Sequence, residues 1–549
     1  MEQKKGLLSI INKTVFFPPA IAVVFFIILG IVIPEQFASG ASTALSWITT
    51  NFTWFYAIGA TLLLAFCFWA GFSKYGRIKL GGPDAKPEMK RANWFFIALC
   101  AGIATGIVFW GVAEPMIHFA NPPAFLGIEG NSVESGQAAV PISAFHWTFH
   151  TYGIYVSCAL CMAFFYYNCK QKFLVSTGMY GILGDRINGN IGRFIDALAI
   201  FAIIGGIGTS YGFGVMQIGS GLNFLWDVPI SNFLYIGIIG VITAIYVTSS
   251  YTGLHKGIKM LSQVNVSLYF FLILFLLLLG PTLHLLNGLV QNVGAYFNNL
   301  ISMSFYTDYM YKTGWSGSWS IFYWAWWLAY APIVGLFLVR CAYGRTIREF
   351  VVVNLMLPSL FGIVWFSVFG NAAIYLDFFE GANIAATISE FGTEVSMFAL
   401  FSQFPLATLT CALAMIAVAL SFVTLSDSMT STIAMMTTKD FGVVDGKEVD
   451  LRDRDANEAP APIKLFWGIS MGLSAYVLLT TGGTAALQSS VIICGLPILV
   501  LQLLMAIGYI RAMIHLDEYD KVSSKALIAE LMKKEELSTM DEESPVLNM

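Results

Sequence analysis

Six large aromatic residues occur within one apolar stretch that is long enough to span a membrane: Trp319, Tyr323, Trp324, Trp326, Trp327 and Tyr330. At a rise of about 1.5 Å per residue they occupy roughly three turns of a helix. Lipid does not require them there, because tryptophan prefers the two interfaces and Leu or Val suits the bilayer centre. Facing aromatic rings are, however, the usual receptor for a quaternary ammonium group. The stretch therefore predicts a binding site for a trimethylammonium compound inside a membrane.

A second aromatic group lies in the stretch 145–155, which we expect to form the fourth span. Trp147, Tyr152 and Tyr155 could face the aromatic residues of the eighth span. The alternative is an interfacial aromatic belt, which needs no ligand. His146 and His150 are four residues apart, as metal ligands on a helix can be, but no third ligand follows them. Packing or hydrogen bonding is therefore the simpler prediction for both histidines.

Small residues interrupt the expected third span at Ala101, Gly102, Ile103 and Ala104, just before Gly106. Such residues weaken a helix and let another backbone approach closely. Close helix packing is one explanation for them. The functional alternative is an unwound segment whose backbone groups bind an ion or a carboxylate, as in inverted-repeat transporters.

Polar residues in the expected tenth span form a candidate cation site that comprises Thr424, Asp427 and Ser428. A carboxylate inside a membrane is costly and is a functional hypothesis by default, although a hydrogen bond between helices is the alternative. Hydroxyl and carboxylate oxygens suit a hard cation such as Na⁺. If an ion is coupled, we expect these groups and the carbonyl oxygens of Ala101 and Ile103 to bind it, and we expect no cofactor or other metal.

The elements that must position these residues are membrane helices. The 549 residues are 57% hydrophobic and 11% charged, whereas a soluble chain carries about 25% charged residues. Lys and Arg gather in alternate loops, which places both termini in the cytoplasm. We predict an all-α polytopic protein with a cytoplasmic N-terminus (1–14), a membrane domain (15–514) and an acidic cytoplasmic tail (515–549). Its twelve spans centre near residues 24, 63, 104, 156, 207, 241, 276, 330, 360, 418, 473 and 501.

These segments together resemble the betaine/choline/carnitine transporter family over residues 15–514. The resemblance rests on Trp110–Pro115, Phe145–Trp147, the glycine-rich stretch 205–214, Tyr323–Trp327 and Gly344–Glu349. It implies two inverted five-helix repeats of the LeuT type, about 93–290 and 317–514, behind two N-terminal helices. It also implies a homotrimer in the cell (inner) membrane that works by alternating access.

The resemblance further implies the residues of the substrate and ion sites. Asn265 and Val334 match sodium-coupled members, because the sodium-independent carnitine antiporters carry Arg and Met at these positions. Leu425 departs from the pattern, since sodium-coupled members usually have a hydroxyl residue there. Backbone groups of residues 101–104 would hold a substrate carboxylate. By position, the aromatic box would comprise Trp147, Tyr152, Tyr155, Trp319, Tyr323, Trp326, Trp327 and Tyr330.

We therefore expect a secondary transporter for a trimethylammonium compound such as betaine, carnitine or choline, with Na⁺ symport. The main alternatives are a sodium-independent exchange of the carnitine/γ-butyrobetaine type and coupling to H⁺. A membrane enzyme would need a convergent catalytic constellation, which the sequence does not display, and a channel conflicts with a deep binding box. The expected partners are the small substrate and membrane lipid, without nucleic acid.

Overall fold

Helices build nearly the whole of the described chain, because a membrane segment must satisfy its own backbone hydrogen bonds. The computed structural model describes residues 10–103, 106–252, 255–439, 443–444, 447–448 and 459–532. Its first half contains α2 (Lys13–Val32), α3 (Pro34–Phe72), η1 (Lys74–Arg77), α4 (Arg91–Ile103), α5 (Gly106–Ala120), η2 (Ala124–Leu126), α6 (Val133–Trp147), α7 (Phe149–Tyr167), η3 (Val175–Met179), α8 (Tyr180–Leu183), η4 (Gly184–Asn188), α9 (Asn190–Trp226), α10 (Asn232–Thr252), α11 (His255–Leu279) and α12 (Thr282–Ser304).

The second half is also helical, and two of its short elements, η5 and η6, are π-helical turns. It contains η5 (Gly317–Ile321), α13 (Phe322–Ala342), α14 (Ile347–Val351), η6 (Val352–Met356), α15 (Leu357–Glu380), α16 (Ile384–Phe391), η7 (Thr393–Val395), α17 (Ser396–Phe401), α18 (Ala407–Met436), α19 (Ala461–Ile514), α20 (Leu516–Tyr519) and α21 (Lys525–Met532). Between α18 and α19, the two-residue strands β1 (Val443–Val444) and β2 (Lys447–Glu448) pair antiparallel.

Nine helical stretches of the described chain are long and apolar enough to cross a membrane, and the number is ten if the bent pair α11–α12 counts as one more. The predicted eleventh and twelfth spans are joined in α19. They are separated by Gly483, whose φ of 54° and ψ of −134° suit only glycine. The predicted third span is divided between α4 and α5, on either side of residues 104–105. The chain is therefore a multi-pass membrane protein, while the count of twelve spans and the inverted repeat stay predictions.

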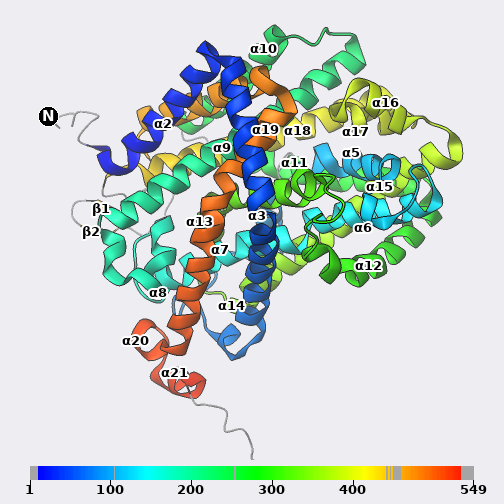
Figure 1. Cartoon of the computed structure of the whole chain (residues 1–549). Coiled ribbons are helices and arrows are strands. Elements are labelled where there is room, and N and C mark those ends of the chain that lie inside the picture. The colour runs from blue at the N-terminus through cyan, green and yellow to red at the C-terminus, as the bar shows by residue number, and fades with distance from the viewer. Residues whose placement is uncertain are drawn as a thin grey trace, which may run out of the picture.

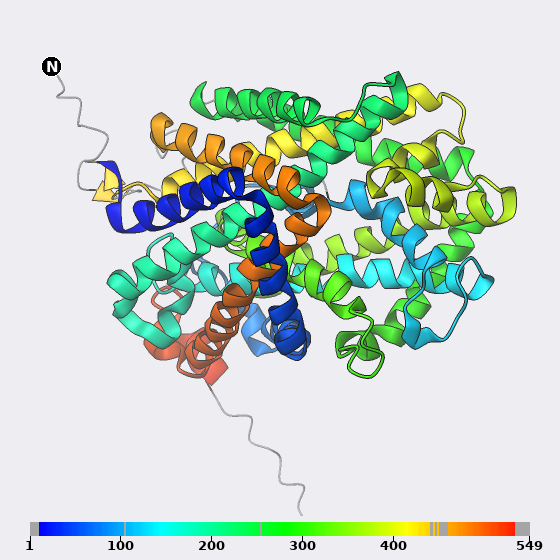
Figure 2. The same cartoon turned by 45° about the horizontal axis from the view of Figure 1, so that its top comes forward.

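The centre of the bundle is formed by α13 and α7, which pack side by side, and by α19, which crosses α9 and α3 (Figures 1 and 2). The apolar stretches of α6–α7 and η5–α13 are almost completely buried within the protein. By contrast, α10 buries only 22% of its apolar stretch, and Phe233 at its start is 85% exposed. Apolar side chains on the outside suit contact with lipid, so the buried aromatic helices are the place to look for a site.

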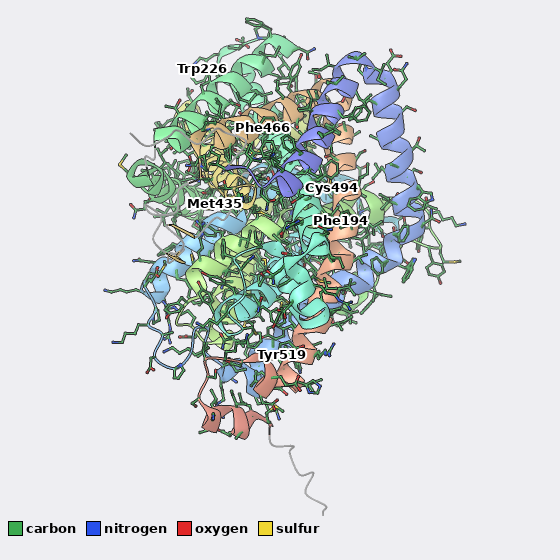
Figure 3. The ribbon with its side chains drawn as sticks, turned by 90° about the vertical axis from the view of Figure 1, so that its left-hand side faces the viewer. Phe194, Trp226, Met435, Phe466, Cys494 and Tyr519 are labelled. Carbon is green, nitrogen blue, oxygen red and sulfur yellow. The ribbon has the colours of Figure 1, made fainter. Side chains whose placement is uncertain are left out.

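The beginning of the predicted acidic tail is docked onto the protein. Asp520 accepts a hydrogen bond from Asn168 Nδ2 at 3.0 Å, and the backbone N–H of Lys521 donates to the Asn168 carbonyl oxygen at 2.9 Å. Further along, Glu530 pairs with Arg77 at 2.7 Å. Tyr519 marks this region at the lower end of the molecule in Figure 3. An acidic composition is typical of a solvated segment, and it did not predict the contacts that the described part of the tail, which ends at residue 532, makes with the protein.

Candidate functional site

The predicted aromatic residues of the fourth and eighth spans meet around Trp327. Its ring centroid lies 4.4 Å from that of Tyr155, 5.0 Å from that of Tyr152 and 6.1 Å from that of Trp147. All four side chains are at most 6% exposed. The rings of Trp147 and Tyr152 stand edge-on to Trp327, at 77° and 71°. Three helices, α6, α7 and α13, therefore bring their rings to one place, which we call the aromatic box.

A break in the fourth span orients two walls of the box. Helix α6 ends at Trp147 and α7 begins at Phe149, because Thr148 between them has φ of −124° and ψ of −118°, which is not helical. The Thr148 hydroxyl lies 2.7 Å from the Ala144 carbonyl oxygen and 2.9 Å from the Tyr296 hydroxyl. Trp147 and Tyr152 thus point towards Trp327 from two short helices, which the sequence did not predict.

Tyr323 and Trp326 extend the box along α13. Their ring centroids lie 5.0 and 6.1 Å from that of Trp147. Trp326 is held by a hydrogen bond from its Nε1 to Ser210 Oγ, at 3.1 Å. A Cβ on Gly106 would lie only 2.5 Å from the Trp147 ring, so the backbone of the third span touches the box directly.

Two of the predicted box residues lie at its edges. Trp319 belongs to the π-helical turn η5, and its ring centroid is 4.4 Å from that of His118 and 5.9 Å from that of Trp110. Tyr330 packs on α9, where a Cβ on Gly206 would lie 3.0 Å from the tyrosine ring. The ring contacts of Trp327 among the described residues are with Trp147, Tyr152 and Tyr155, so the group is better described as a central box with two flanking aromatic residues.

The segment predicted to unwind is helical as far as it is described. Helix α4 ends with Ala101, Gly102 and Ile103, and α5 begins at Gly106. Ala104 lies outside the described residues, as do the side chains of residues 101–103. The backbone of residues 101–103 is therefore helical, which differs from the unwinding expected there, although the last carbonyl groups of a helix have no partner within that helix.

The predicted cation ligands lie on one stretch of α18. The Thr424 hydroxyl donates to the carbonyl oxygens of Leu420 and Ser421, at 2.9 and 3.0 Å, which leaves its oxygen lone pairs for another group. Asp427 is 8% exposed and Ser428 is half-buried. Their oxygen atoms make this turn suitable for a hard cation.

Asn265 connects α11 to this part of α18. Its Nδ2 donates to Ser421 Oγ at 2.7 Å and contacts the Tyr269 hydroxyl at 3.3 Å. Its Oδ1 is buried and has no hydrogen-bond partner among the described residues. A buried amide oxygen without a partner is costly, and it is also a suitable ligand for Na⁺.

One group of buried residues was missed as a group by the sequence reasoning. Glu114 Oε1 lies 2.6 Å from His146 Nδ1 and 3.5 Å from His118 Nε2, and Glu114 Oε2 accepts from Trp147 Nε1 at 2.8 Å. His146 Nε2 lies 3.0 Å from Ser320 Oγ. Both ring nitrogens of His146 are thus engaged in hydrogen bonds, so we interpret the group as a hydrogen-bond network. The spacing of Glu114 and His118 by four residues was the available signal.

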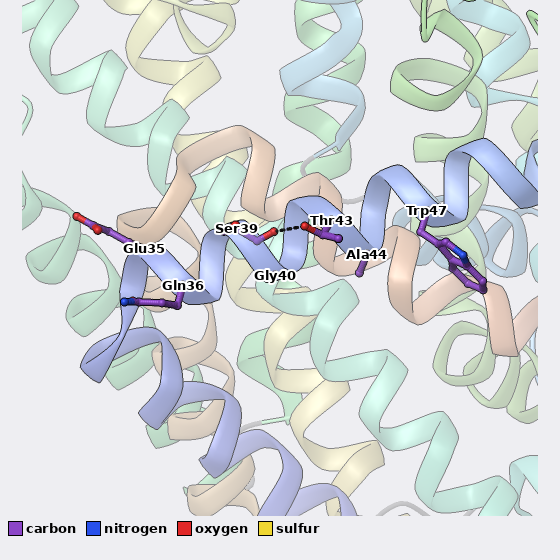
Figure 4. Close-up of a pocket in the computed structure, with 7 residues that line it drawn as sticks. All are labelled: Glu35, Gln36, Ser39, Gly40, Thr43, Ala44 and Trp47. Carbon is purple, nitrogen blue, oxygen red and sulfur yellow. Dashed lines mark hydrogen bonds between the residues drawn. The ribbon is translucent and has the colours of Figure 1, made fainter.

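A separate depression of about 780 Å³ lies along the first half of α3 (Figure 4). It is lined by Glu35, Gln36, Ser39, Gly40, Thr43, Ala44 and Trp47. All seven belong to one helix, and Trp47 is 58% exposed. A site that must enclose a cation between facing rings needs several helices, so this depression does not compete with the aromatic box.

Comparison with known proteins gives matches over most of the chain. Residues 14–518 match the model of the betaine/carnitine/choline family transporter. The glycine betaine transporter OpuD of Bacillus subtilis is 37% identical over 484 residues, which cover 87% of this chain and 90% of the relative. The ectoine/hydroxyectoine transporter of Virgibacillus pantothenticus is 34% identical over 92% of this chain and 97% of the relative. The high-affinity choline transport protein of Escherichia coli K12 is 34% identical over 89% of this chain and 70% of the relative.

Proposed function

The chain belongs to the betaine/carnitine/choline transporter family, and on that premise we propose that it is a secondary transporter of a small trimethylammonium compound that binds in the aromatic box. The names of its relatives refer to glycine betaine, choline and ectoine, so betaine and choline are the first substrates to test. The comparisons support transport of such compounds and give no sign of an enzyme.

The observation that carries the proposal is the convergence of four buried rings, those of Trp147, Tyr152, Tyr155 and Trp327, from three helices. Each desolvated ring contributes about 0.5–2 kcal/mol to the binding of an ammonium ion. Apolar packing alone does not require tryptophan and tyrosine at the buried centre of a membrane protein, because aliphatic residues fill such space. A cation that enters this site would exchange its hydration for aromatic faces.

The carboxylate of a zwitterionic substrate would bind to backbone groups of the third span. This part of the proposal is supported by Gly106, whose missing side chain brings the backbone against Trp147. An ammonium group in the box and a carboxylate at the third span would then be held a few ångströms apart, as in a betaine.

We further propose that transport is coupled to Na⁺, bound near Thr424, Asp427 and Ser428. The buried Asn265 Oδ1, which lies on the neighbouring helix, supports a site for a hard cation in this region. Carbonyl oxygens of Ala101 and Ile103 would complete the shell. Leu425 offers no ligand, so the site would depend strongly on Thr424. The alternative is an exchange of substrate for product without Na⁺, as in carnitine/γ-butyrobetaine antiporters.

We also propose that the protein is a homotrimer in the inner membrane, with both termini in the cytoplasm.

Uptake into proteoliposomes tests the proposal. The purified protein is reconstituted, and uptake of labelled betaine, choline, carnitine and γ-butyrobetaine is measured with and without an inward Na⁺ gradient. We expect saturable uptake of at least one compound, stimulated by the gradient. Saturable uptake that ignores Na⁺ but needs internal substrate would replace symport by exchange, and the absence of uptake and of binding for all four compounds would refute the proposed function.

A further inference from the structure

A buried carboxylate lies directly behind one wall of the aromatic box. Glu114 on α5 accepts a hydrogen bond from the indole N–H of Trp147, with a distance of 2.8 Å between Oε2 and Nε1. Its other oxygen accepts from His146 Nδ1, and His146 Nε2 accepts from the Ser320 hydroxyl at 3.0 Å. The side chain of Glu114 is completely buried. A single indole therefore separates this carboxylate from the proposed ammonium site.

His118 lies one helical turn from Glu114 and is also completely buried. Neither of its ring nitrogens has a hydrogen-bond partner among the described residues, although Nε2 lies 3.5 Å from Glu114 Oε1. A neutral imidazole left in this way loses its hydrogen bonds to water without replacement. Burial opposes a charge on the imidazole, but a protonated His118 would form an ion pair with the adjacent carboxylate, which offsets that cost.

The rings around His118 also suit a cation. The ring centroid of Trp319 lies 4.4 Å from that of His118, and the centroid of Trp315 lies 5.8 Å from it. An aromatic face attracts an imidazolium ion as it attracts an ammonium ion. Trp319 and Ser320 both come from the π-helical turn η5, and such turns are frequent at functional sites.

We propose that Glu114, His118 and His146 form a proton-binding site that works in competition with the ammonium substrate, an inference that rests on the proposed transport function. With an ionised Glu114 and two neutral histidines, the cluster carries one negative charge, which attracts a cation on the far side of Trp147. A proton on His118 cancels that charge. Bound proton and bound substrate therefore disfavour each other, and by linkage the binding of a cationic substrate releases a proton.

The size of the effect follows from Coulomb's law. For charges about 10 Å apart at an effective dielectric constant of about 20, the loss of one charge changes the affinity for a cation roughly tenfold. A zwitterion also carries a carboxylate, on which the cluster acts with the opposite sign. Protonation therefore weakens the binding of choline, which has a net positive charge, more than the binding of betaine, which has none.

Other ionisable groups around the cluster are engaged elsewhere or lie farther away. Asp308 accepts from Tyr306, Thr313 and the backbone N–H of Trp315, and His150 contacts Ser304 at 3.0 Å. The ring of Tyr323 on α13 stacks on His146. The other ionisable side chains on α6 and on the elements packed against α5 and α6 are Glu134 on α6, Tyr330, Arg340 and Cys341 on α13, Tyr152, Tyr155, Cys158, Cys161, Tyr166 and Tyr167 on α7, His284 and Tyr296 on α12, Tyr375, Asp377 and Glu380 on α15, Glu390 on α16, Glu394 on η7, and Arg193, Asp196 and Tyr211 on α9. Among the described residues the Tyr323 hydroxyl and His150 Nδ1 also have no hydrogen-bond partner, but His118 is the histidine with neither ring nitrogen paired and with a carboxylate oxygen at 3.5 Å.

Equilibrium binding of labelled choline and betaine to the purified full-length protein tests the proposal between about pH 5 and pH 8, the range in which histidine titrates. As the pH falls, we expect the dissociation constant of choline to rise about tenfold relative to that of betaine. In weakly buffered solution with a pH-sensitive dye, choline should also release protons. A tenfold coupling corresponds to a release of at most about half a proton per binding site, at the midpoint of the effect.

Two histidine variants provide the matched comparison. In His118→Asn the relative affinity for choline and betaine should no longer depend on pH, whereas His150→Asn, which changes another buried histidine of the same region, should keep the dependence. A wild-type choline-to-betaine ratio that is constant over this range would overturn the proposal while leaving the proposed transport function intact, and so would a His118→Asn variant that keeps the dependence. A metal ion that copurifies with the protein and whose chelation abolishes the pH effect would also overturn it, because the three side chains would then bind metal. If neither compound binds at any pH, the proposed function itself fails.

Discussion

Replacement of Trp327 by leucine should weaken substrate binding without preventing folding. Trp327 is the ring that contacts the other three walls of the box, at centroid distances of 4.4 to 6.1 Å. Leucine removes the aromatic face that would lie against the ammonium group, at a cost of about 1–2 kcal/mol, and it loosens the three rings that remain. The dissociation constant for choline or betaine should rise by at least about 5- to 30-fold.

The same helix provides the control for this variant. Trp324 is 1% exposed, and its ring stacks on His150 at 5.4 Å and lies 5.9 Å from Phe145, outside the box. Trp324→Leu loses a comparable amount of aromatic packing, and both variants should be destabilised by less than the about 3–5 kcal/mol of a Trp→Ala change. Binding should nevertheless stay normal in Trp324→Leu.

Tryptophan fluorescence titration of both variants, together with their thermal unfolding, separates binding from folding. The reasoning predicts similar losses of melting temperature and very different dissociation constants. Wild-type affinity in a folded Trp327→Leu variant would remove the aromatic box from the account. An equal loss of affinity in the two variants would show that general packing, and not the position of Trp327, controls binding.

Three further changes test other parts of the structure. In Gly106→Val the new Cβ would lie 2.5 Å from the Trp147 ring, which is closer than two carbon atoms can approach. Substrate binding, measured by titration, should weaken by about an order of magnitude, and stability, measured by thermal unfolding, should fall by about 1–3 kcal/mol. Normal binding would contradict the placement of Gly106 against the box. Thr424→Ala should raise the Na⁺ concentration for half-maximal uptake several-fold, because a lost buried polar partner costs about 1–3 kcal/mol. The substrate affinity at saturating Na⁺ should change much less. An unchanged Na⁺ requirement would exclude Thr424 as a ligand. Truncation after Met532 should leave uptake and its response to osmolality unchanged. Truncation after Asp517 also removes the contact between Asp520 and Asn168 and should lower the melting temperature. Equal melting temperatures of the two truncated proteins would show that this contact does not contribute to stability.

The positions of the main helices and the aromatic residues could be predicted from the sequence, because both depend on local composition. The stretch from Trp319 to Tyr330 stood out by residue type alone, and its helix is buried. Which rings meet depends on contacts between helices far apart in the chain. For this reason the sequence did not separate Trp319, which lies beside His118, from Trp327, which lies beside Tyr155.

The network around Glu114 shows what local spacing leaves open. Packing or hydrogen bonding was the simpler prediction for His146 and His150, and the structure confirms hydrogen bonds for both, but their spacing of four residues did not report which partners each would have. Thr148 interrupts the helix between them, so His146 points to Glu114 and Ser320 while His150 contacts Ser304. A single non-helical residue changes the direction of the side chains on either side of it, and no periodicity in the sequence reports such a break.

The tail illustrates a different limit. Its acidic composition predicts a solvated segment, and composition says nothing about a few specific contacts. Asp520 docks because Asn168 and the backbone around it offer matching donors, and Leu531 is 2% exposed. Such contacts depend on the shape of a loop that only the folded protein has.

The most direct test of the central claim compares choline with its neutral carbon isostere, in which a tert-butyl group replaces the trimethylammonium group. The two molecules have nearly the same shape, so apolar packing treats them alike, while only choline gains cation–π energy from Trp147, Tyr152, Tyr155 and Trp327. Competition against labelled choline or betaine on the purified protein gives both affinities in one assay. The account predicts that the isostere binds at least about tenfold more weakly than choline, and equal affinities would contradict it.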